Sequence, residues 1–395
     1  MSTNKNPLAQ SVVIKDVHIK NRLVKSATQE SMTGGQGDIT NTYKQYYGRL
    51  SSGGVGLIIT GHMYVHENGK LPGMAGIEKD ERISPLRQVT NYVHQHNSTI
   101  FAQVNYANLK KIIEKKSGKK EWLPNTLSKE DIEEIIDCFG KAAARVKKAG
   151  FDGIQLHAAH SYLLAQFLSK KVNQRQDKYG GSLSNRQRLC IEVYRAIRES
   201  VGEGFPVIVK LDSYSRSFVT VPPLTKTITL RESLDTAKKL EKSGVDAIEV
   251  TCFLATRGAL PYKQKHIDWL KTQGKETRAN VVGVLLTPID LVINHPQWFK
   301  PHQNIAHIKA FKKHLHIPIL AGSCFRDPLY MKKVITNNEA DMICLARPLI
   351  CDPDFPNAIL NGDDSRSKCH NCNLCSLCLP PNERPLHCVY NQQYH

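Results

Sequence analysis

Two histidines and a tyrosine lie close together in the stretch GIQLHAAHSY, and all three residue types can donate hydrogen bonds or protons. His157 and His160 fall at the end of an apolar run and the start of the loop that follows. Their imidazoles can converge on a carbonyl oxygen or a flat anion, and the Tyr162 hydroxyl can give a proton at neutral pH. One such histidine is most often structural, but the three residues together predict a catalytic site.

A second pattern is typical of phosphate binding. AGS at 321–323 and ARP at 346–348 each close an apolar run. Backbone amides and a cation bind phosphate at such places in many α/β barrels, although glycine turns also occur for conformational reasons alone. We expect Gly322, Ser323 and Arg347, with Ala346 beside them, to bind the phosphate of a cofactor.

Cysteines are concentrated near the C-terminus, in CHNCNLCSLCLPPNERPLHC. They are Cys369, Cys372, Cys375, Cys378 and Cys388. Because the cytosol keeps thiols reduced, free thiols or metal ligands are favoured over disulfides. The CxxC spacing is a strong signal for an iron–sulfur cluster or zinc, and a metal-free segment is the remaining alternative.

Eight short apolar runs must position these groups, and helical patterns separate them. The runs lie around Leu23 and at 55–60, 99–104, 153–158, 207–212, 247–252, 317–322 and 342–347. Strands that are apolar on both faces suit a parallel sheet covered on each side. The sequence therefore predicts an α/β fold, a (β/α)8 TIM barrel with a short cysteine-rich C-terminal extension.

Two helices and one long connection are well marked between the runs. One helix begins after Ser128, where Asp131 completes a capping box, and stops at Gly150. A second follows Ser184. The connection at 253–303 is long enough to be a lid over the C-terminal ends of the strands, where barrels place their chemistry; a peripheral decoration or dimer contact is an equal alternative.

Composition limits the class of protein. The chain has 395 residues, 41% of them hydrophobic, with no secretory signal and no apolar run that could span a membrane, so we expect a cytoplasmic protein. The net charge of +18 admits nucleic-acid binding. The densest basic run, at 110–120, lacks regularly interleaved aromatic residues, and we interpret it as a solvated loop.

The stretch from Gly150 to Arg188, GFDGIQLHAAHSYLLAQFLSKKVNQRQDKYGGSLSNRQR, resembles the core signature of the Old Yellow Enzyme family. The resemblance continues over most of residues 10–360. It implies that His157 and His160 bind a substrate carbonyl and that Tyr162 is the proton donor. Ser161 stands where the family usually has glycine.

The resemblance also implies an FMN site. Ser26, Ala27 and Thr28 should border the flavin ring, Gly61 should contact it, Gln103 should bind its pyrimidine edge, and Lys210 should stabilise the reduced anion. The family often reads QLNHAGR where this chain has QVNYANL at 103–109, so contacts downstream of Gln103 are open. Gln29 stands where some relatives tune the flavin with a thiol or hydroxyl.

The dienoyl-reductase branch of the family, which this chain resembles, carries a four-cysteine [4Fe–4S] site after the barrel. By this resemblance the ligands are Cys369, Cys372, Cys375 and Cys388, with Cys378 an alternative third ligand because the spacing differs. We expect a barrel at 1–362 and a cysteine-rich segment at 363–395. Relatives with the cluster carry further nucleotide-binding domains, which we do not expect here.

The leading functional hypothesis is ene reduction: NADH or NADPH reduces FMN, and hydride then passes to an activated alkene. Amine dehydrogenation or demethylation, electron transfer, and a non-catalytic scaffold are alternatives. An RNA-modifying flavin barrel would need an N-x-G-C-P motif, which the sequence lacks. Expected partners are a small-molecule alkene and a nicotinamide dinucleotide, without nucleic acid or membrane; a homo-oligomer is possible. The sequence does not distinguish NADH from NADPH.

Overall fold

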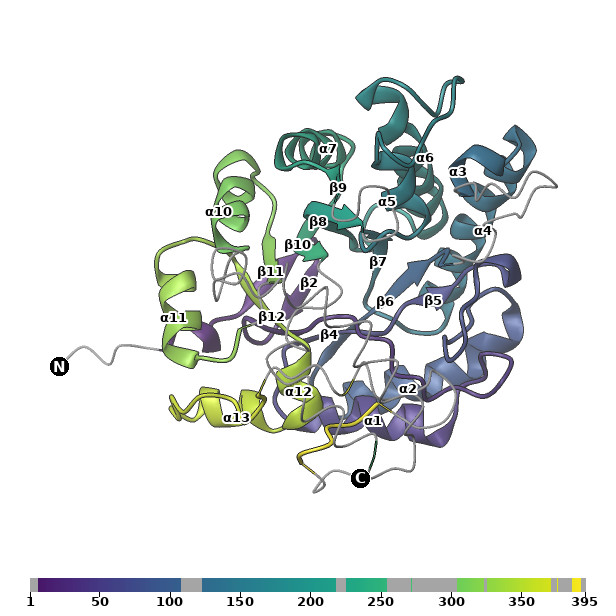
Figure 1. Cartoon of the computed structure of the whole chain (residues 1–395). Helices are drawn as coiled ribbons and strands as arrows, with labels where there is room; N and C mark the ends of the chain where they lie inside the picture. Colours follow the sequence, from purple (N-terminus) through teal and green to yellow (C-terminus); the bar gives the residue numbers. More distant parts are fainter. Residues whose placement is uncertain are drawn as a thin grey trace.

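A closed ring of eight parallel strands forms the centre of the molecule (Figure 1). The computed structural model describes residues 6–107, 123–217, 225–253, 271, 304–322, 325–370, 375 and 386–391. The strands are β3 (Leu23–Lys25), β4 (Leu57–Ile59), β6 (Thr99–Asn105), β7 (Gly153–Ala158), β8 (Val207–Ser217), β10 (Ala247–Phe253), β11 (Ile319–Gly322) and β12 (Met342–Leu345). Parallel pairing of β8 with β10 and of β12 with β3 closes the ring, which confirms the predicted TIM barrel.

Helices surround the ring, and small elements decorate its ends (Figure 1). The helices are α1 (Asn41–Ser52), α2 (Ile83–His94), α3 (Leu123–Thr126), α4 (Lys129–Lys148), α5 (Leu163–Leu168), α6 (Leu183–Val201), α7 (Leu230–Lys242), α10 (Ile305–His314), α11 (Pro328–Thr336), α12 (Arg347–Cys351) and α13 (Phe355–Leu360). The short elements are η1 (Pro7–Ala9), η2 (Glu67–Gly69), η3 (Asp80–Arg82), β5 (Met63–Tyr64) and β9 (Thr225–Ile228).

Local signals fixed the ends of the two predicted helices. Ser128 and Asp131 form the expected capping box before α4, and Gly150 follows that helix at φ +82°. The predicted start of α6 was wrong by two residues: Ser182, not Ser184, caps it by accepting the amide of Asn185. Ser182 is the cap because its hydroxyl lies three residues before the Asn185 amide, which has no partner within the first turn of the helix.

Apolar side chains fill the interior of the ring at the N-terminal ends of its strands. They include Val24, Leu57, Ile59, Phe101, Ile208, Leu320 and Met342. An antiparallel hairpin of β1 (Val12–Ile14) and β2 (Val17–Ile19) adds Ile14 and Ile19 to this cluster. Buried polar side chains, among them Gln103 and Lys210, follow Phe101 and Ile208 along the same strands, toward the C-terminal ends where barrels place their chemistry.

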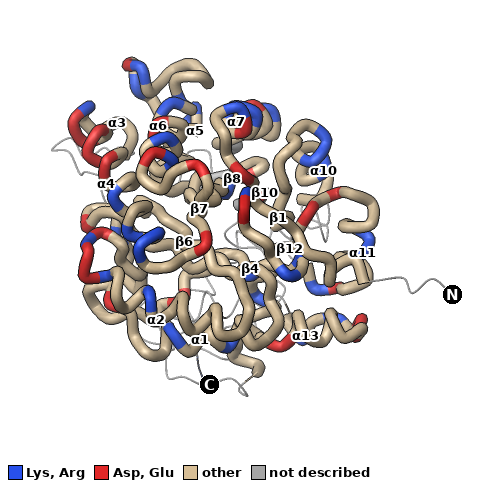
Figure 2. The backbone as a smooth tube through the Cα atoms, turned by 180° about the vertical axis from the view of Figure 1, so that it is seen from behind, with Lys and Arg blue, Asp and Glu red and all other residues tan. Residues whose placement is uncertain are grey.

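Positive and negative side chains are interspersed on the outer surface. Figure 2 shows basic and acidic residues together on helices such as α4 and α7. The basic run at 110–120 and nearly all of the proposed lid at 253–303 lie outside the described residues. Among the helices that the structure describes, none is both long and apolar enough to cross a membrane.

Candidate functional site

The three residues of the predicted catalytic set converge at the C-terminal end of β7. The ring of His157 lies 5.0 Å from that of His160 and 5.2 Å from that of Tyr162, between ring centres. His157 is 3% exposed, and its Nδ1 atom has no hydrogen-bond partner in the described structure. A buried polar atom without a partner is costly, so this nitrogen is placed to bind something that enters the site.

The environment fixes the protonation states of these groups. Burial, aided by neighbouring histidines and Lys210, holds the pKa of His157 well below its usual range. Burial and then Lys210 do the same to the pKa of His160. Burial raises the pKa of Tyr162 to about 12. At neutral pH the site therefore presents two uncharged imidazoles and a protonated phenol.

The loop after β7 holds an unfavourable backbone conformation. His160 and Ser161 have φ angles of +60° and +61°, in the left-handed region that glycine adopts without penalty. Asp212, on β8, accepts the His160 amide at 2.8 Å, and the Gln166 side chain donates to the Ser161 carbonyl at 2.8 Å. These two bonds hold the loop in the conformation that aims the His160 ring at His157.

Ser161→Gly is expected to raise the free energy of unfolding by roughly 1 kcal/mol, because glycine removes the left-handed penalty of an L-residue. Urea unfolding at a fixed FMN concentration measures it. Ser161→Ala is the control: it removes the hydroxyl but keeps the penalty, and should give no gain. Equal effects of both variants would contradict this explanation.

The buried carboxyl of Asp212, next to His160, makes the stability of the fold depend on pH. Burial raises the pKa of its carboxyl to about 7, although the His160 amide and Lys210 both act to lower it. The folded pKa lies above the unfolded value of about 4, so the folded state binds the proton more tightly and stability falls as pH rises from about 4 to about 7.

Asp212→Asn should abolish this pH dependence while still accepting the His160 amide. Between about pH 5 and about pH 8 the native protein should lose roughly 2 kcal/mol of stability relative to the asparagine variant. Urea unfolding of both proteins at the two pH values is the measurement. Parallel stability curves would show that Asp212 is ionised throughout.

His62, which the sequence analysis missed, is a third imidazole of this cluster. Its ring centre lies 5.0 Å from that of Tyr162 and 5.9 Å from that of His157. Burial, followed by Lys210, lowers the pKa of His62 to about 4. The only sequence signal was its place directly after the second strand, beside the predicted flavin contact Gly61.

Two amides fix the tautomer of His62. The Asn105 side-chain amide lies 2.8 Å from Nδ1, and Gln29 Oε1 lies 3.3 Å from Nε2. The Gln29 amide nitrogen donates to the Pro72 carbonyl at 2.7 Å, so Gln29 turns its oxygen toward the ring. In a neutral ring Nε2 then carries the proton and Nδ1 accepts from Asn105.

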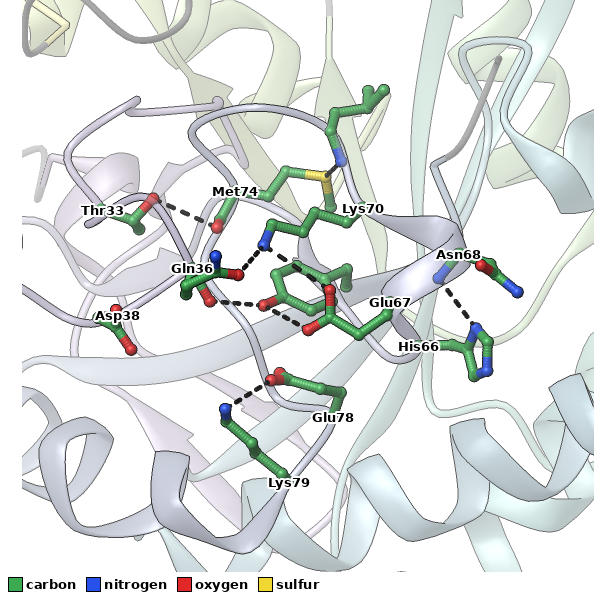
Figure 3. A network of polar contacts seen from close by, with 12 residues as sticks. Thr33, Gln36, Asp38, His66, Glu67, Asn68, Lys70, Met74, Glu78 and Lys79 are labelled. Carbon is green, nitrogen blue, oxygen red and sulfur yellow. Dashed lines mark hydrogen bonds and ion pairs between the residues drawn. The ribbon is translucent and has the colours of Figure 1, made fainter. Parts of the chain in front are cut away.

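Polar contacts brace the loop that carries His62 against the loop after β3 (Figure 3). Lys70 donates to Gln36 Oε1 at 3.1 Å and pairs with Glu67 at 3.7 Å. Thr33 donates to the Met74 carbonyl at 3.2 Å. The Tyr64 hydroxyl, at the centre of the network, donates to the Gln36 carbonyl at 2.8 Å. The two loops therefore form one rim beside the imidazole cluster.

The structure joins three predicted flavin contacts into a single buried network. Lys210 donates to Ser26 Oγ at 2.9 Å, and Gln103 donates to Gln155 at 2.6 Å. Glu249 connects these halves: it accepts from Ser26 at 2.5 Å and from Gln155 at 2.8 Å, and lies 2.9 Å from the Lys210 ammonium. Gln155 and Glu249 were not predicted, although a charged and an amide side chain within apolar strands were visible signals.

The remaining predicted ring contacts lie at the ends of β3 and β4. Ala27 and Thr28 follow Ser26 and are partly exposed. The Gly61 amide donates to the buried Glu30 carboxylate at 2.6 Å. A Cβ atom on Gly61 would collide with that carboxylate, so a larger residue there would require the Glu30 side chain to move.

The predicted phosphate end is described in part. Gly322 ends β11 and Arg347 begins α12 directly after β12, on neighbouring strands of the ring, with Ala346 between β12 and α12. The Gly322 carbonyl accepts from the buried Asn304 side chain at 3.0 Å. A Cβ atom on Gly322 would lie 2.9 Å from the Val250 carbonyl oxygen. Ser323 lies outside the described residues.

The cysteine-rich segment docks on the barrel next to α12. The Leu386 amide donates to the Glu30 carbonyl at 2.9 Å, and the Asn391 side chain donates to the Cys351 carbonyl at 2.6 Å. Cys388 forms a side-chain hydrogen bond with Cys351, a barrel thiol that the sequence analysis missed. Cys369 and Cys375 are partly buried, whereas Cys372 and Cys378 lie outside the described residues. Among described residues no group of three potential ligands could hold a metal, and the metal site stays a prediction.

Comparison with known proteins gives relatives at modest identity. An NADH oxidase from Thermoanaerobacter brockii is 28% identical over 376 residues, covering 91% of this chain but 52% of the oxidase. An NADPH dehydrogenase from Bacillus cytotoxicus is 29% identical over 360 residues, covering 88% of this chain and 90% of the dehydrogenase. This chain thus spans about half the length of the first relative.

Solved structures share the fold. A 2-naphthoyl-CoA reductase complex matches with a TM-score of 0.74 at 22% identity, covering 93% of this chain and 54% of that chain. An Old Yellow Enzyme homologue from Zymomonas mobilis matches with a TM-score of 0.69 at 20% identity, covering 92% of this chain and 96% of that chain. A histamine dehydrogenase from a Rhizobium species matches with a TM-score of 0.69 at 21% identity, covering 91% of this chain and 48% of that chain. Residues 7–251 match the sequence profile of NADH:flavin oxidoreductases and NADH oxidases, and this chain therefore belongs to that FMN-dependent family.

Proposed function

We propose that this protein is an ene reductase: it takes electrons from NADH or NADPH through FMN and reduces an activated alkene such as an α,β-unsaturated carbonyl compound. The observation that carries the proposal is the buried Nδ1 atom of His157, which has no hydrogen-bond partner among the described residues, beside neutral His160 and protonated Tyr162. This set can bind a neutral carbonyl group and supply a proton to the carbon next to it.

The described residues fit FMN. Gln103 and Ser26 offer hydrogen-bonding groups, and Lys210 a buried cation, around the C-terminal mouth of the barrel. Gly61 and Gly322 let the backbone pack closely against the Glu30 carboxylate and the Val250 carbonyl at the ends of β4 and β11. Arg347 follows β12, where barrels often bind phosphate. We assign the flavin ring to Gln103, Ser26 and Lys210. We assign the phosphate to Gly322, Ser323, Ala346 and Arg347.

The chain's own residues would act on the substrate as follows. His157 and His160 would donate hydrogen bonds to the carbonyl oxygen and so draw electron density from the alkene. Tyr162 would deliver a proton to the α carbon, since its hydroxyl stays protonated at neutral pH. Bound FMN supplies hydride transfer, from the nicotinamide and then to the β carbon.

An anaerobic absorbance experiment on the FMN-loaded protein tests the proposal. NADH and NADPH, added separately, should bleach the flavin bands with at least one of them, and cyclohexenone should restore the colour. Bleaching by histamine or another amine, without nicotinamide, would instead support amine dehydrogenation. A protein that retains no FMN from a riboflavin-supplied preparation would support the scaffold alternative.

We further propose the barrel at 1–362 and a cysteine-rich segment at 363–395 that binds a cluster through Cys369, Cys372, Cys375 or Cys378, and Cys388. The contacts of residues 386–391 with Glu30 and Cys351 support the proposal, because they place this part of the segment against the barrel. Iron and acid-labile sulfide analysis of anaerobically purified protein tests it. Zinc without iron, or neither metal, would overturn the iron–sulfur assignment.

A further inference from the structure

The cation of the proposed flavin site is directly paired with a buried anion. Lys210 and Glu249 are 3% and 1% exposed, and their charged atoms lie 2.9 Å apart. The two residues are direct partners across parallel strands β8 and β10. Because the two opposite charges lie so close together, their effects on a group that binds nearby largely cancel, and removing either one would leave a charge that solvent screens little.

The Glu249 carboxylate is held ionised by donors on several strands. Ser26 donates from the end of β3, Gln155 from β7 and the Cys344 thiol from β12. Burial by itself would raise the pKa of Glu249, but Lys210 and the bonds from Ser26 and Gln155 hold it below its usual value. Glu249 is thus a fixed negative charge bonded to two of the predicted flavin contacts.

We propose that Glu249 is a redox-tuning residue, which offsets the Lys210 charge and lowers the reduction potential of the bound flavin. The inference rests on the proposed function only in placing FMN beside Lys210. A lone Lys210 cation would favour the anionic reduced flavin. Glu249 removes much of that preference and keeps the reduced flavin a stronger hydride donor to the alkene. Glu249 acts on the flavin through its charge and is assigned no contact with reacting atoms, so it is not a catalytic residue.

The midpoint potential of bound FMN, measured by anaerobic dye-equilibrated titration, tests this. Glu249→Gln keeps the size and an acceptor oxygen, and should favour reduced flavin by at least about tenfold, a rise of about 30 mV for a two-electron couple. Lys210→Met should lower the potential. The double variant, with both charges removed, should return close to the native potential. Glu339→Gln, which removes the same charge from the surface pair with Lys309, is the control and should cause no shift.

These arms separate the inference from the proposed function. If the native protein binds no FMN, the proposed function fails. If FMN binds but Glu249→Gln leaves its potential within a few millivolts of native, the inference fails alone. Should Glu249→Gln not fold, the double variant compared with Lys210→Met gives the same Glu249 effect. An equal potential in those two, measured above the pH at which Glu249 ionises in Lys210→Met, would overturn the inference.

Discussion

Tyr162→Phe is expected to slow reoxidation of the reduced flavin by an alkene by roughly 10²–10⁴-fold, the usual contribution of a positioned general acid. Phenylalanine keeps the ring that packs against His157 and His62 but removes the proton. Reduction of the flavin by NADH or NADPH needs no such proton and should be unchanged. Anaerobic stopped-flow absorbance, run on each half-reaction separately, makes the measurement.

Tyr179→Phe is the matched control for this variant. Tyr179 is buried and donates to Glu192 at 2.9 Å, on α6 at the outside of the barrel, so its loss should leave both half-reactions unaltered. Since burial raises the pKa of Tyr162 to about 12, the alkene half-reaction should show no loss from phenol ionisation up to about pH 9. Equal slowing of both half-reactions by Tyr162→Phe would show that the phenol supports the flavin site in general and is not the proton donor to the alkene.

Lys210→Met is expected to destabilise the apoprotein by about 3–5 kcal/mol, because it leaves the Glu249 carboxylate buried without its nearest counter-charge. Methionine nearly matches the lysine stem in size, so lost packing contributes little. Urea unfolding of the FMN-free protein measures this loss of stability separately from any loss of flavin binding.

Lys210→Met combined with Glu249→Gln should recover most of that stability, since replacing both members of a buried pair is often nearly neutral. The difference between the double variant and the sum of the single variants measures the interaction. A loss below about 1 kcal/mol in Lys210→Met would show that Glu249 takes up a proton when its partner is removed.

Short-range signals made much of the fold predictable. Apolar runs flanked by helical patterns identified the eight strands of the ring, and Ser128, Asp131 and Gly150 set the ends of α4. Such signals act within a few residues, through hydrogen bonds to free helix amides and the burial of both faces of a strand. The same locality explains the cluster of His157, His160 and Tyr162, which share one strand end and one loop.

The sequence alone therefore determined the barrel, the family and the residues that cluster on one loop. Tertiary structure alone decided which polar groups meet across strands: His62 beside Tyr162, Asp212 under His160, and Glu249 against Lys210. The partners in these pairs lie tens to about a hundred residues apart in sequence. Closure of the ring and its parallel register bring them together, and no local pattern encodes that register. The physical reason is that buried charges and amides must be paired, and only the closed barrel fixes which partner is within reach.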